Sequence, residues 1–264
     1  MKKQYFFVSG LPRAGSTLLI NILGQNPNFR VGGTSGIMDI IFGVRNNWDK
    51  LIEFKASPNE EGKKRVLRGI LDNYYGETEH PVVFDKCRGW LSLLEMAEML
   101  LEKKAKVLVP VRDLREILSS FEKLWRNTSK TQQISQESQY YFDFQTIEGR
   151  CGVWMRNDQP VGLACNRLKD ALRRGFRDRL LFVEYKELTN YPKATMEKIY
   201  EFLEQDKFDH NFEYVEQITQ EDDSIHGFKG LHQIKTKVEA PQPDYLQVLG
   251  PEISKKYAGP YIWS

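Results

Sequence analysis

The sequence predicts an α/β protein in which a parallel β-sheet is covered by helices on both faces. Continuous apolar runs of strand length recur along the chain, as expected for strands that are buried on both faces. Each run is followed by a stretch whose apolar residues recur at helical spacing, and this alternation is typical of parallel sheets. The chain has 264 residues, of which 41% are hydrophobic, so it can bury a substantial core. We expect a single elaborated domain that spans residues 1–264.

Four strand–helix pairs make up the predicted sheet. The helix after the last strand opens with Pro192, a residue that suits the first turn of a helix. The strands are expected at 5–8, 81–86, 106–112 and 179–185, and the helices after them at STLLINILGQ, LSLLEMAEMLLEKK, DLREILSSFEKLWR and PKATMEKIYEFLEQ.

Three stretches depart from this alternation. Residues 36–79 have helical spacing without an intervening strand, which predicts a helical insertion. Residues 127–157 are polar and rich in Gln and Ser, so we expect a long surface loop or lid. Residues 205–264 show little periodicity and are expected to form an irregular C-terminal segment.

The bulk composition argues against several classes of function. The 38 basic and 36 acidic residues leave a net charge of +2, too small for a typical nucleic-acid partner. The three cysteines are an odd number at wide spacing, which favours a reducing compartment over a disulfide framework or metal site. The first apolar run is too short for a signal peptide or membrane span. A cytoplasmic location is therefore expected, and the oligomeric state stays open.

The segment SGLPRAGST, residues 9–17, follows the first predicted strand directly and precedes a helix. Gly10 and Gly15 have the spacing of a nucleotide-binding loop, and such a loop directs backbone N–H groups and a helix N-terminus at an anion. Kinases and GTPases have a lysine after the second glycine, but here that position is Ser16, and Arg13 is the loop's only cation. The loop therefore favours a ligand with a single 5′-phosphate over a triphosphate with magnesium.

A second anion site is predicted where the third strand ends. Arg112 closes this strand, and Ser120 lies two turns into the next helix. Ligands collect at the carboxyl ends of parallel strands, and a guanidinium there presents a planar fork to a phosphate. An ordinary strand–helix junction, with Arg112 paired to a surface acid, explains the same residues.

Together the two motifs resemble the sulfotransferase family that uses 3′-phosphoadenosine-5′-phosphosulfate (PAPS), nearest to its protein-tyrosine-sulfating and bacterial-type branches. GLPRAGSTLL resembles the family's 5′-phosphosulfate loop, and VRDLREILSSF resembles its 3′-phosphate motif. The likeness covers residues 5–30, 80–126 and 179–204. It implies a three-layer sandwich like that of the P-loop NTPases, and PAPS as the donor.

The resemblance also implies roles for individual residues. Lys86 falls where the tyrosine-sulfating branch has a catalytic lysine, and a cation there suits charge that develops on a sulfuryl group. Lys235 belongs to a basic segment that many members close over the nucleotide, although a solvated loop explains it as well. Tyr185 matches a position near the nucleotide, or is a core aromatic. The implied donor site is Arg13, Ala14, Gly15, Ser16, Thr17, Arg112, Ser120, Tyr185 and Lys235, with Arg13 and Lys86 as the catalytic residues.

The general base does not transfer from the resemblance. The tyrosine-sulfating branch has a glutamate after the first helix, but Thr34 stands at that position here, and a hydroxyl does not replace a carboxylate at neutral pH. Asp39, His80 and Asp85 are the alternatives, and the base stays unassigned.

The expected reaction is metal-independent, in-line sulfuryl transfer that releases adenosine 3′,5′-bisphosphate. The acceptor is a hydroxyl or amine of a small molecule, carbohydrate, lipid or peptide. An atypical P-loop phosphotransferase or NTPase and a catalytically inactive nucleotide-binding protein are the alternatives.

Overall fold

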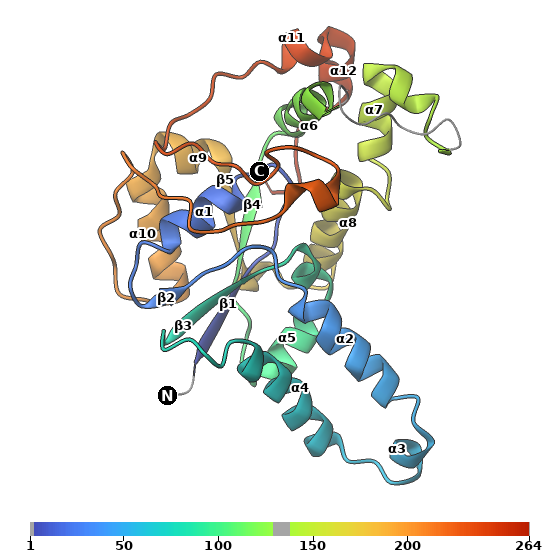
Figure 1. Cartoon of the computed structure of the whole chain (residues 1–264), viewed down its shortest axis with the longest axis vertical. Coiled ribbons are helices and arrows are strands. Elements are labelled where there is room, and N and C mark those ends of the chain that lie inside the picture. The colour runs from blue at the N-terminus through green and yellow to red at the C-terminus, as the bar shows by residue number, and fades with distance from the viewer. Residues whose placement is uncertain (1–2, 129–137, 264) are drawn as a thin grey trace.

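The computed structural model describes residues 3–128 and 138–263. Within these residues, five parallel strands form one sheet in the order β2-β3-β1-β4-β5 (Figure 1). This confirms the predicted parallel sheet with helices on its faces. The sequence does not predict β2, because two residues are too few to form an apolar run. The strands are β1 (Gln4–Val8), β2 (Phe29–Arg30), β3 (Val82–Lys86), β4 (Val107–Val111) and β5 (Leu180–Glu184).

Strand β1 lies in the middle of the sheet and sets the position of the site. It pairs with β3 from Gln4 opposite Val82 to Val8 opposite Lys86, and its end also pairs with β4. The chain builds the β3 side of the sheet first and then returns to the β4 side. The carboxyl end of β1 is therefore a topological switch point, where open parallel sheets bind their ligands.

The side chains of β1 alternate between two hydrophobic layers. Tyr5 and Phe7 face one layer, and Phe6 and Val8 face the other, each at most 1% exposed. The first layer packs against α4 (Glu60–Tyr74), α5 (Leu94–Leu101), α6 (Leu114–Thr128) and α8 (Pro160–Arg173), and the second against α1 (Ser16–Leu23), α9 (Tyr185–Asn190) and α10 (Pro192–Leu203). This is the three-layer arrangement that apolar strands between amphipathic helices favour.

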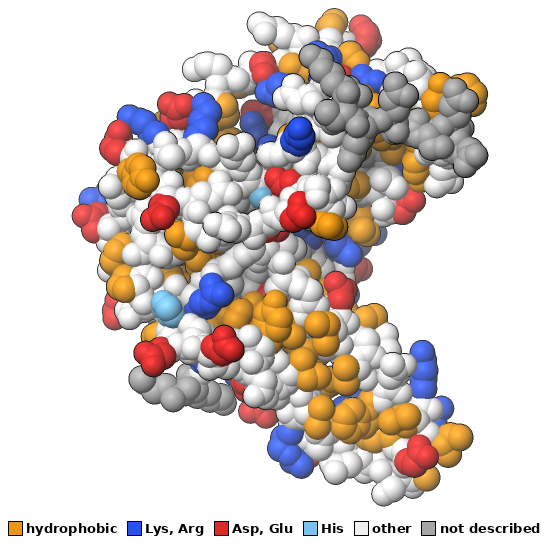
Figure 2. All heavy atoms as spheres, viewed as in Figure 1, with side chains coloured by type: hydrophobic (Ala, Val, Ile, Leu, Met, Phe, Trp, Pro, Cys, Tyr) orange, Lys and Arg blue, Asp and Glu red, His pale blue; other side chains and the backbone are white. Residues whose placement is uncertain are grey.

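Residues 37–74 form a helical arm that extends away from the sheet (Figure 1). Hydrophobic side chains gather on its surface (Figure 2), among them Ile40, Leu51 and Ile52, which are more than half exposed. Two tyrosine hydroxyls tie the base of the arm to the sheet: Tyr5 donates to Asp72 at 2.8 Å, and Tyr75 donates to Asp85. The arm consists of α2 (Ile37–Trp48), α3 (Ile52–Ala56) and α4.

The segment 127–157, for which a loop or lid is expected, includes residues 129–137, which lie outside the described residues. Its described part instead contains a 3-10 turn, η2 (Asp143–Gln145), and the helix α7 (Ile147–Trp154). The Thr146 side chain caps α7 by accepting a hydrogen bond from the Gly149 N–H at 3.0 Å. Polar residues and glycines dilute the apolar spacing of α7, so the sequence does not reveal the helix.

The C-terminal segment contains short elements joined by irregular chain, and it crosses the face of the molecule near α1 and β4 (Figure 1). Its elements are the 3-10 turn η4 (Asp223–His226) and the helices α11 (Tyr245–Leu249) and α12 (Pro251–Lys256). Two further 3-10 turns, η1 (Arg88–Ser92) and η3 (Arg177–Arg179), lie earlier in the chain. None of the described helices is both long and apolar enough to pass through a membrane.

Candidate active site

The loop between β1 and α1 contains two residues in the left-handed region, Arg13 at φ +58° and Gly15 at φ +85°. This conformation is uncommon for a residue with a side chain, and such residues gather at ligand sites. A Cβ atom on Gly15 would lie 2.5 Å from the Tyr185 ring, and one on Gly10 would overlap the Pro110 backbone. Both glycines are therefore needed for close packing against β4 and α9, as well as for the turn.

This loop leaves a row of backbone donors unused at the start of α1. The first backbone hydrogen bond of the helix is donated by the Leu19 N–H to the Gly15 carbonyl at 2.9 Å. Among the described residues, the N–H groups of Ser16, Thr17 and Leu18 have no acceptor. These donors stand at the positive end of the helix, where an anion is stabilised.

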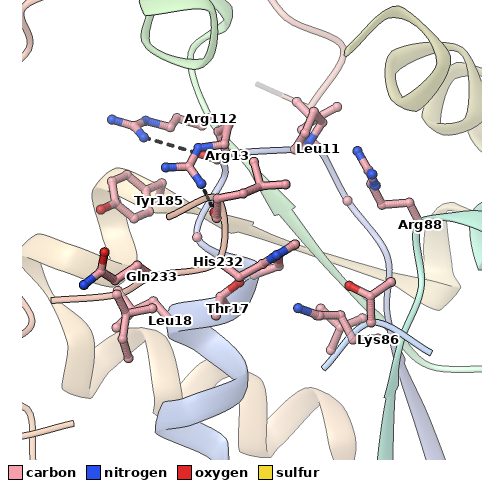
Figure 3. Close-up of a pocket in the computed structure, with 18 of the residues that line it drawn as sticks. Leu11, Arg13, Thr17, Leu18, Lys86, Arg88, Arg112, Tyr185, His232 and Gln233 are labelled. Carbon is pink, nitrogen blue, oxygen red and sulfur yellow. Dashed lines mark hydrogen bonds between the residues drawn. The ribbon is translucent and has the colours of Figure 1, made fainter. Parts of the chain in front are cut away.

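The second predicted anion site adjoins the first. Arg112 donates from Nη1 to the Arg13 carbonyl oxygen at 3.1 Å, and from Nε to Glu116 at 2.8 Å. Its guanidinium also stacks on the Tyr185 ring, 4.3 Å from the centroid. Arg13 in turn donates from Nε to the Ser120 hydroxyl at 3.0 Å. The loop, the end of β4 and the start of α6 therefore meet at one point (Figure 3).

A cavity of about 330 Å³ contains most of the predicted donor residues. Two predicted residues do not line it: Ala14 is buried in the core, and Ser120 reaches the site through its hydrogen bond to Arg13. Lys235 lines it from the C-terminal segment, ion-paired with Glu239 at 2.7 Å. The other predicted residues along its wall are Arg13, Gly15, Ser16, Thr17, Lys86, Arg112 and Tyr185.

The C-terminal segment covers this cavity with backbone as well as side chains. The Leu231 carbonyl accepts a hydrogen bond from Nη1 of Arg13, and His232 and Gln233 lie beside Thr17 and Leu18 (Figure 3). Burial and the neighbouring charge of Arg112 lower the pKa of Arg13. Two guanidiniums held together in a partly closed site favour an anionic ligand, because an anion offsets their mutual repulsion.

Lys86 reaches the same cavity from the end of β3, but it is already paired. Its ammonium group lies 2.7 Å from Oε1 of Glu221, and both side chains are nearly buried, at 6% and 11% exposure. Glu221 also lies against the Gly33–Thr34 turn, where a Cβ atom on Gly33 would come within 2.8 Å of its Cγ. Burial would raise the pKa of Glu221, but the contacts with Lys86 and Thr34 outweigh it, so this pKa lies below its usual range.

The three sequence candidates for the base have different surroundings. Asp85 is fully buried and accepts hydrogen bonds from Tyr75 and, at 2.5 Å, from Trp90; burial raises its pKa. His80 precedes β3, at the end of the strand opposite the site, and its ring contacts Thr78 at 2.7 Å. Asp39 is exposed in the first turn of α2. None of the three lines the cavity of about 330 Å³, in which we propose below that the donor binds.

Sequence reasoning missed two charged residues here, Arg88 and Glu221. Arg88 follows β3 by two residues and extends into the cavity (Figure 3), and its side chain has no hydrogen bond or ion pair with the described residues. Its place at a strand end was a usable signal. Glu221 gave none, because it lies in an aperiodic segment 135 residues from its partner Lys86.

Comparison with known proteins agrees with this geometry. Residues 6–210 match the Sulfotransferase family. A protein-tyrosine sulfotransferase of Drosophila melanogaster is 24% identical over 204 residues, which cover 75% of this chain and 37% of that protein. The matched region is thus little more than a third of that relative's length.

Two solved structures share the fold. The sulfotransferase domain of the Synechococcus PCC 7002 olefin synthase superposes with a TM-score of 0.53 at 18% identity, and 98% of each chain is covered. The sulfotransferase domain of the curacin biosynthetic pathway gives a TM-score of 0.50 at 14% identity, covering 100% of this chain and 94% of that one. The chain belongs to the sulfotransferase family.

Proposed function

We propose that this protein transfers a sulfuryl group from PAPS to a hydroxyl or amine of its acceptor. The observation that carries the proposal is the junction of the two anion sites, where Arg112 lies 3.1 Å from the backbone of Arg13. A single nucleotide with charge at both its 5′ and 3′ positions can touch both sites at once. A triphosphate would concentrate its charge at the loop, where the lysine that serves kinases is replaced by Ser16.

The residues present fit this donor. The free N–H groups of Ser16, Thr17 and Leu18 suit the 5′-phosphosulfate, as do the hydroxyls of Ser16 and Thr17. Arg112 suits the 3′-phosphate, because Glu116 and the Tyr185 ring hold its guanidinium in place while one edge stays available.

The chemistry follows from where these charges lie. An acceptor oxygen or nitrogen attacks sulfur, the bond from sulfur to the 5′-phosphate oxygen breaks, and adenosine 3′,5′-bisphosphate leaves. Negative charge grows on that bridging oxygen and on the sulfuryl oxygens. Arg13 and Lys86 line the cavity on either side of the loop amides and stabilise this charge as the bond lengthens.

The acceptor binds on the β3 side of the cavity. Thr34, Cys87 and Arg88 line this side, and Phe121 of α6 and Phe228 of the C-terminal segment add apolar surface to the same cavity. An apolar wall with one unpaired guanidinium suits a molecule with a ring or chain near its reacting group. A small molecule, carbohydrate, lipid or peptide can meet that requirement, and the tyrosine sulfotransferase relative makes a peptide tyrosine a natural probe.

The test is incubation with 35S-labelled PAPS and a panel of acceptors in the presence of EDTA. The panel holds a phenol, an amino sugar, a long-chain alcohol and a tyrosine peptide, and labelled product is expected with at least one. Ser16→Lys should weaken sulfuryl transfer if the protein is a sulfotransferase. It should increase phosphoryl transfer if the protein is an atypical P-loop phosphotransferase. ATP-dependent phosphorylation that needs magnesium, with no transfer from PAPS, would refute the proposal.

A further inference from the structure

The acceptor must lose a proton during transfer, and Thr34 stands where the tyrosine-sulfating branch has its glutamate. The structure brings a carboxylate to that place from elsewhere in the chain, because Glu221 is ion-paired at 2.7 Å with Lys86, the bridge partner of Thr34, and lines the same hollow as Thr34. We propose that Glu221 is the general base, supplied by the C-terminal segment instead of the segment after the first helix. This inference rests on the proposed sulfuryl transfer.

Buried hydrogen bonds fix the position of Glu221. Asn21, in α1, is 1% exposed, and its side-chain oxygen accepts hydrogen bonds from the backbone N–H groups of Ile218 at 2.7 Å and Thr219 at 3.1 Å. Its amide donates to the Thr219 hydroxyl at 3.0 Å. The chain is thus anchored to the helix of the donor loop two residues before Glu221.

The opposite wall is shaped to accept this carboxylate. Gly33 contacts the Glu221 side chain so closely that a Cβ atom would lie 2.8 Å from its Cγ. Thr34 pairs in register with Lys86, which extends the parallel sheet edge by one bridge. Glu221 therefore lies in a slot between the end of β3 and the Gly33–Thr34 turn, beside the proposed catalytic lysine.

Glu221 is reachable from the side that the nucleotide does not fill. A second hollow, of about 390 Å³, is lined by Glu221, Thr34, Tyr74, Tyr75 and Glu77. Thr34 also lines the donor cavity, so this residue borders both hollows. An acceptor in the second hollow would approach sulfur from the side of Glu221, with the nucleotide on the far side.

In the absence of a donor, Glu221 is held as an ion pair with Lys86. When the donor is present, Lys86 can turn to the bridging oxygen and the sulfuryl group, and Glu221 loses its cation. Burial then raises the affinity of the carboxylate for a proton. As the acceptor oxygen bonds to sulfur and the sulfur–phosphate bond breaks, the acceptor proton moves to Glu221, and the leaving bisphosphate stays paired with Lys86 and Arg13.

The other charged groups around Glu221 define which alternatives must be tested. Nε2 of His232 lies 3.6 Å from Glu221 Oε2, and its Nδ1 lies 2.6 Å from Asp223. The charge of Arg88 also interacts with that of Glu221. His232 is thus a second group within reach of the acceptor proton, and it needs its own variant.

The first experiment needs no acceptor. Adenosine 3′,5′-bisphosphate is titrated calorimetrically into wild type, Glu221→Gln and Glu216→Gln at pH 5, in buffers of different ionisation enthalpy. If Lys86 leaves Glu221 to contact the ligand, the unpaired carboxylate takes up a proton when the ligand binds. Binding should therefore be accompanied by more proton uptake in wild type than in Glu221→Gln. Glu216, an exposed acid of the same segment, is the matched control and should behave as wild type.

Affinity separates a catalytic role from a structural one. Glu221→Gln should bind the bisphosphate at least as tightly as wild type, because Lys86 no longer has an internal partner. Binding more than tenfold weaker than wild type, or proton uptake equal to that of wild type, would overturn the proposal.

The second experiment measures transfer from labelled PAPS to the panel acceptor that wild type uses fastest. Glu221→Gln should lose about 10²- to 10⁴-fold in kcat, as removal of a general base does. The double variant Thr34→Glu/Glu221→Gln should have a kcat at least tenfold higher than that of Glu221→Gln, since residue 34 lines the same slot. His232→Asn should retain more than a tenth of wild-type turnover.

Each contrary outcome has a distinct meaning. Full turnover in Glu221→Gln, a double variant no faster than Glu221→Gln, or a loss confined to His232→Asn would overturn the assignment of the base while leaving sulfuryl transfer standing. A wild-type protein that transfers nothing from PAPS to any acceptor would overturn the proposed function, and the assignment of Glu221 would fall with it.

Discussion

Arg112 contacts a loop carbonyl, a carboxylate and an aromatic face at once, so its guanidinium is held before any ligand arrives. Removing it should affect the 3′ end of a nucleotide more than the 5′ end. A charge-assisted hydrogen bond contributes about 1.5–3 kcal/mol, which corresponds to roughly 10- to 100-fold in affinity.

We therefore expect Arg112→Ala to weaken binding of adenosine 3′,5′-bisphosphate by about 10- to 100-fold. Adenosine 5′-phosphosulfate, which lacks the 3′-phosphate, should lose only about threefold, through the Arg13 carbonyl contact. Isothermal titration with both ligands measures the difference. Lys123→Ala, on the exposed side of α6, the helix that follows Arg112, serves as the control. Equal losses for the two ligands would contradict the 3′-phosphate assignment.

Gly15 is a second residue whose replacement has a calculable effect. Gly15→Ala places a methyl group 2.5 Å from the Tyr185 ring and a side chain at φ +85°. The backbone term alone is about 1–2 kcal/mol. Urea unfolding should show at least this loss, with a parallel drop in bisphosphate affinity. Gly43→Ala, in a helix with open space around the added carbon, should be neutral or slightly stabilising.

The sequence reveals the site residues that stand next to strands. Arg13, Lys86 and Arg112 each follow or close an apolar run, and the switch-point rule places such residues at one edge. The sequence does not reveal Glu221, because its contact with Lys86 spans 135 residues and arises from the Asn21 anchor. The sequence therefore locates the donor side of the site more fully than the side where the proton leaves.

At the scale of elements, one buried ion pair joins α6 to α7. Glu122 is fully buried, and it receives a two-pronged contact from Arg150, at 2.8 Å from Nε and 2.7 Å from Nη2. Because Arg112 and Ser120 lie beside or on α6, this pair also stabilises the proposed 3′-phosphate site. The sequence does not predict this ion pair between α6 and α7, since it predicts a loop where α7 forms.

Breaking this pair from one side should be more damaging than removing it from both. Glu122→Ala leaves the Arg150 guanidinium buried without its carboxylate, and such a change costs about 3–5 kcal/mol. The double variant Glu122→Leu/Arg150→Met should recover much of that loss, because no buried charge is left uncompensated: Arg126, which also donates to Glu122 at 2.8 Å, is half exposed to solvent. Urea unfolding of the two proteins measures the contrast, and a double variant less stable than the single one would contradict it.

At the scale of the whole molecule, three tyrosine hydroxyls fasten outlying parts to the core. Tyr5 and Tyr75 join the helical arm to β1 and β3, and Tyr261 joins the C-terminal end to Asp113 at the start of α6, at 2.8 Å. Burial and the aspartate partners raise the pKa of all three tyrosines. The stability they provide is present below the ordinary tyrosine pKa of about 10 and is lost as the pH rises above it.

The protein should therefore lose stability steeply in alkali. Each such tyrosine contributes a slope of up to about 1.4 kcal/mol per pH unit above pH 10. Burial also raises the pKa of Cys151 to about 12, which adds to the fall. Urea unfolding from pH 8 to 11 gives the slope. Tyr5→Phe should reduce this slope by the contribution of one tyrosine, up to about 1.4 kcal/mol per pH unit. Tyr191→Phe, at an exposed residue, should leave the slope unchanged.

The Leu231 carbonyl, bonded to the Arg13 guanidinium, gives the protein a weak internal competitor for its own ligand. An anion that binds through Nη1 of Arg13 would displace this oxygen, and a small ion such as sulfate would recover little in exchange. A molecule long enough to grip Arg112 as well more than offsets the lost bond. We therefore expect small anions to bind at this position more weakly than ligands that contact both Arg13 and Arg112.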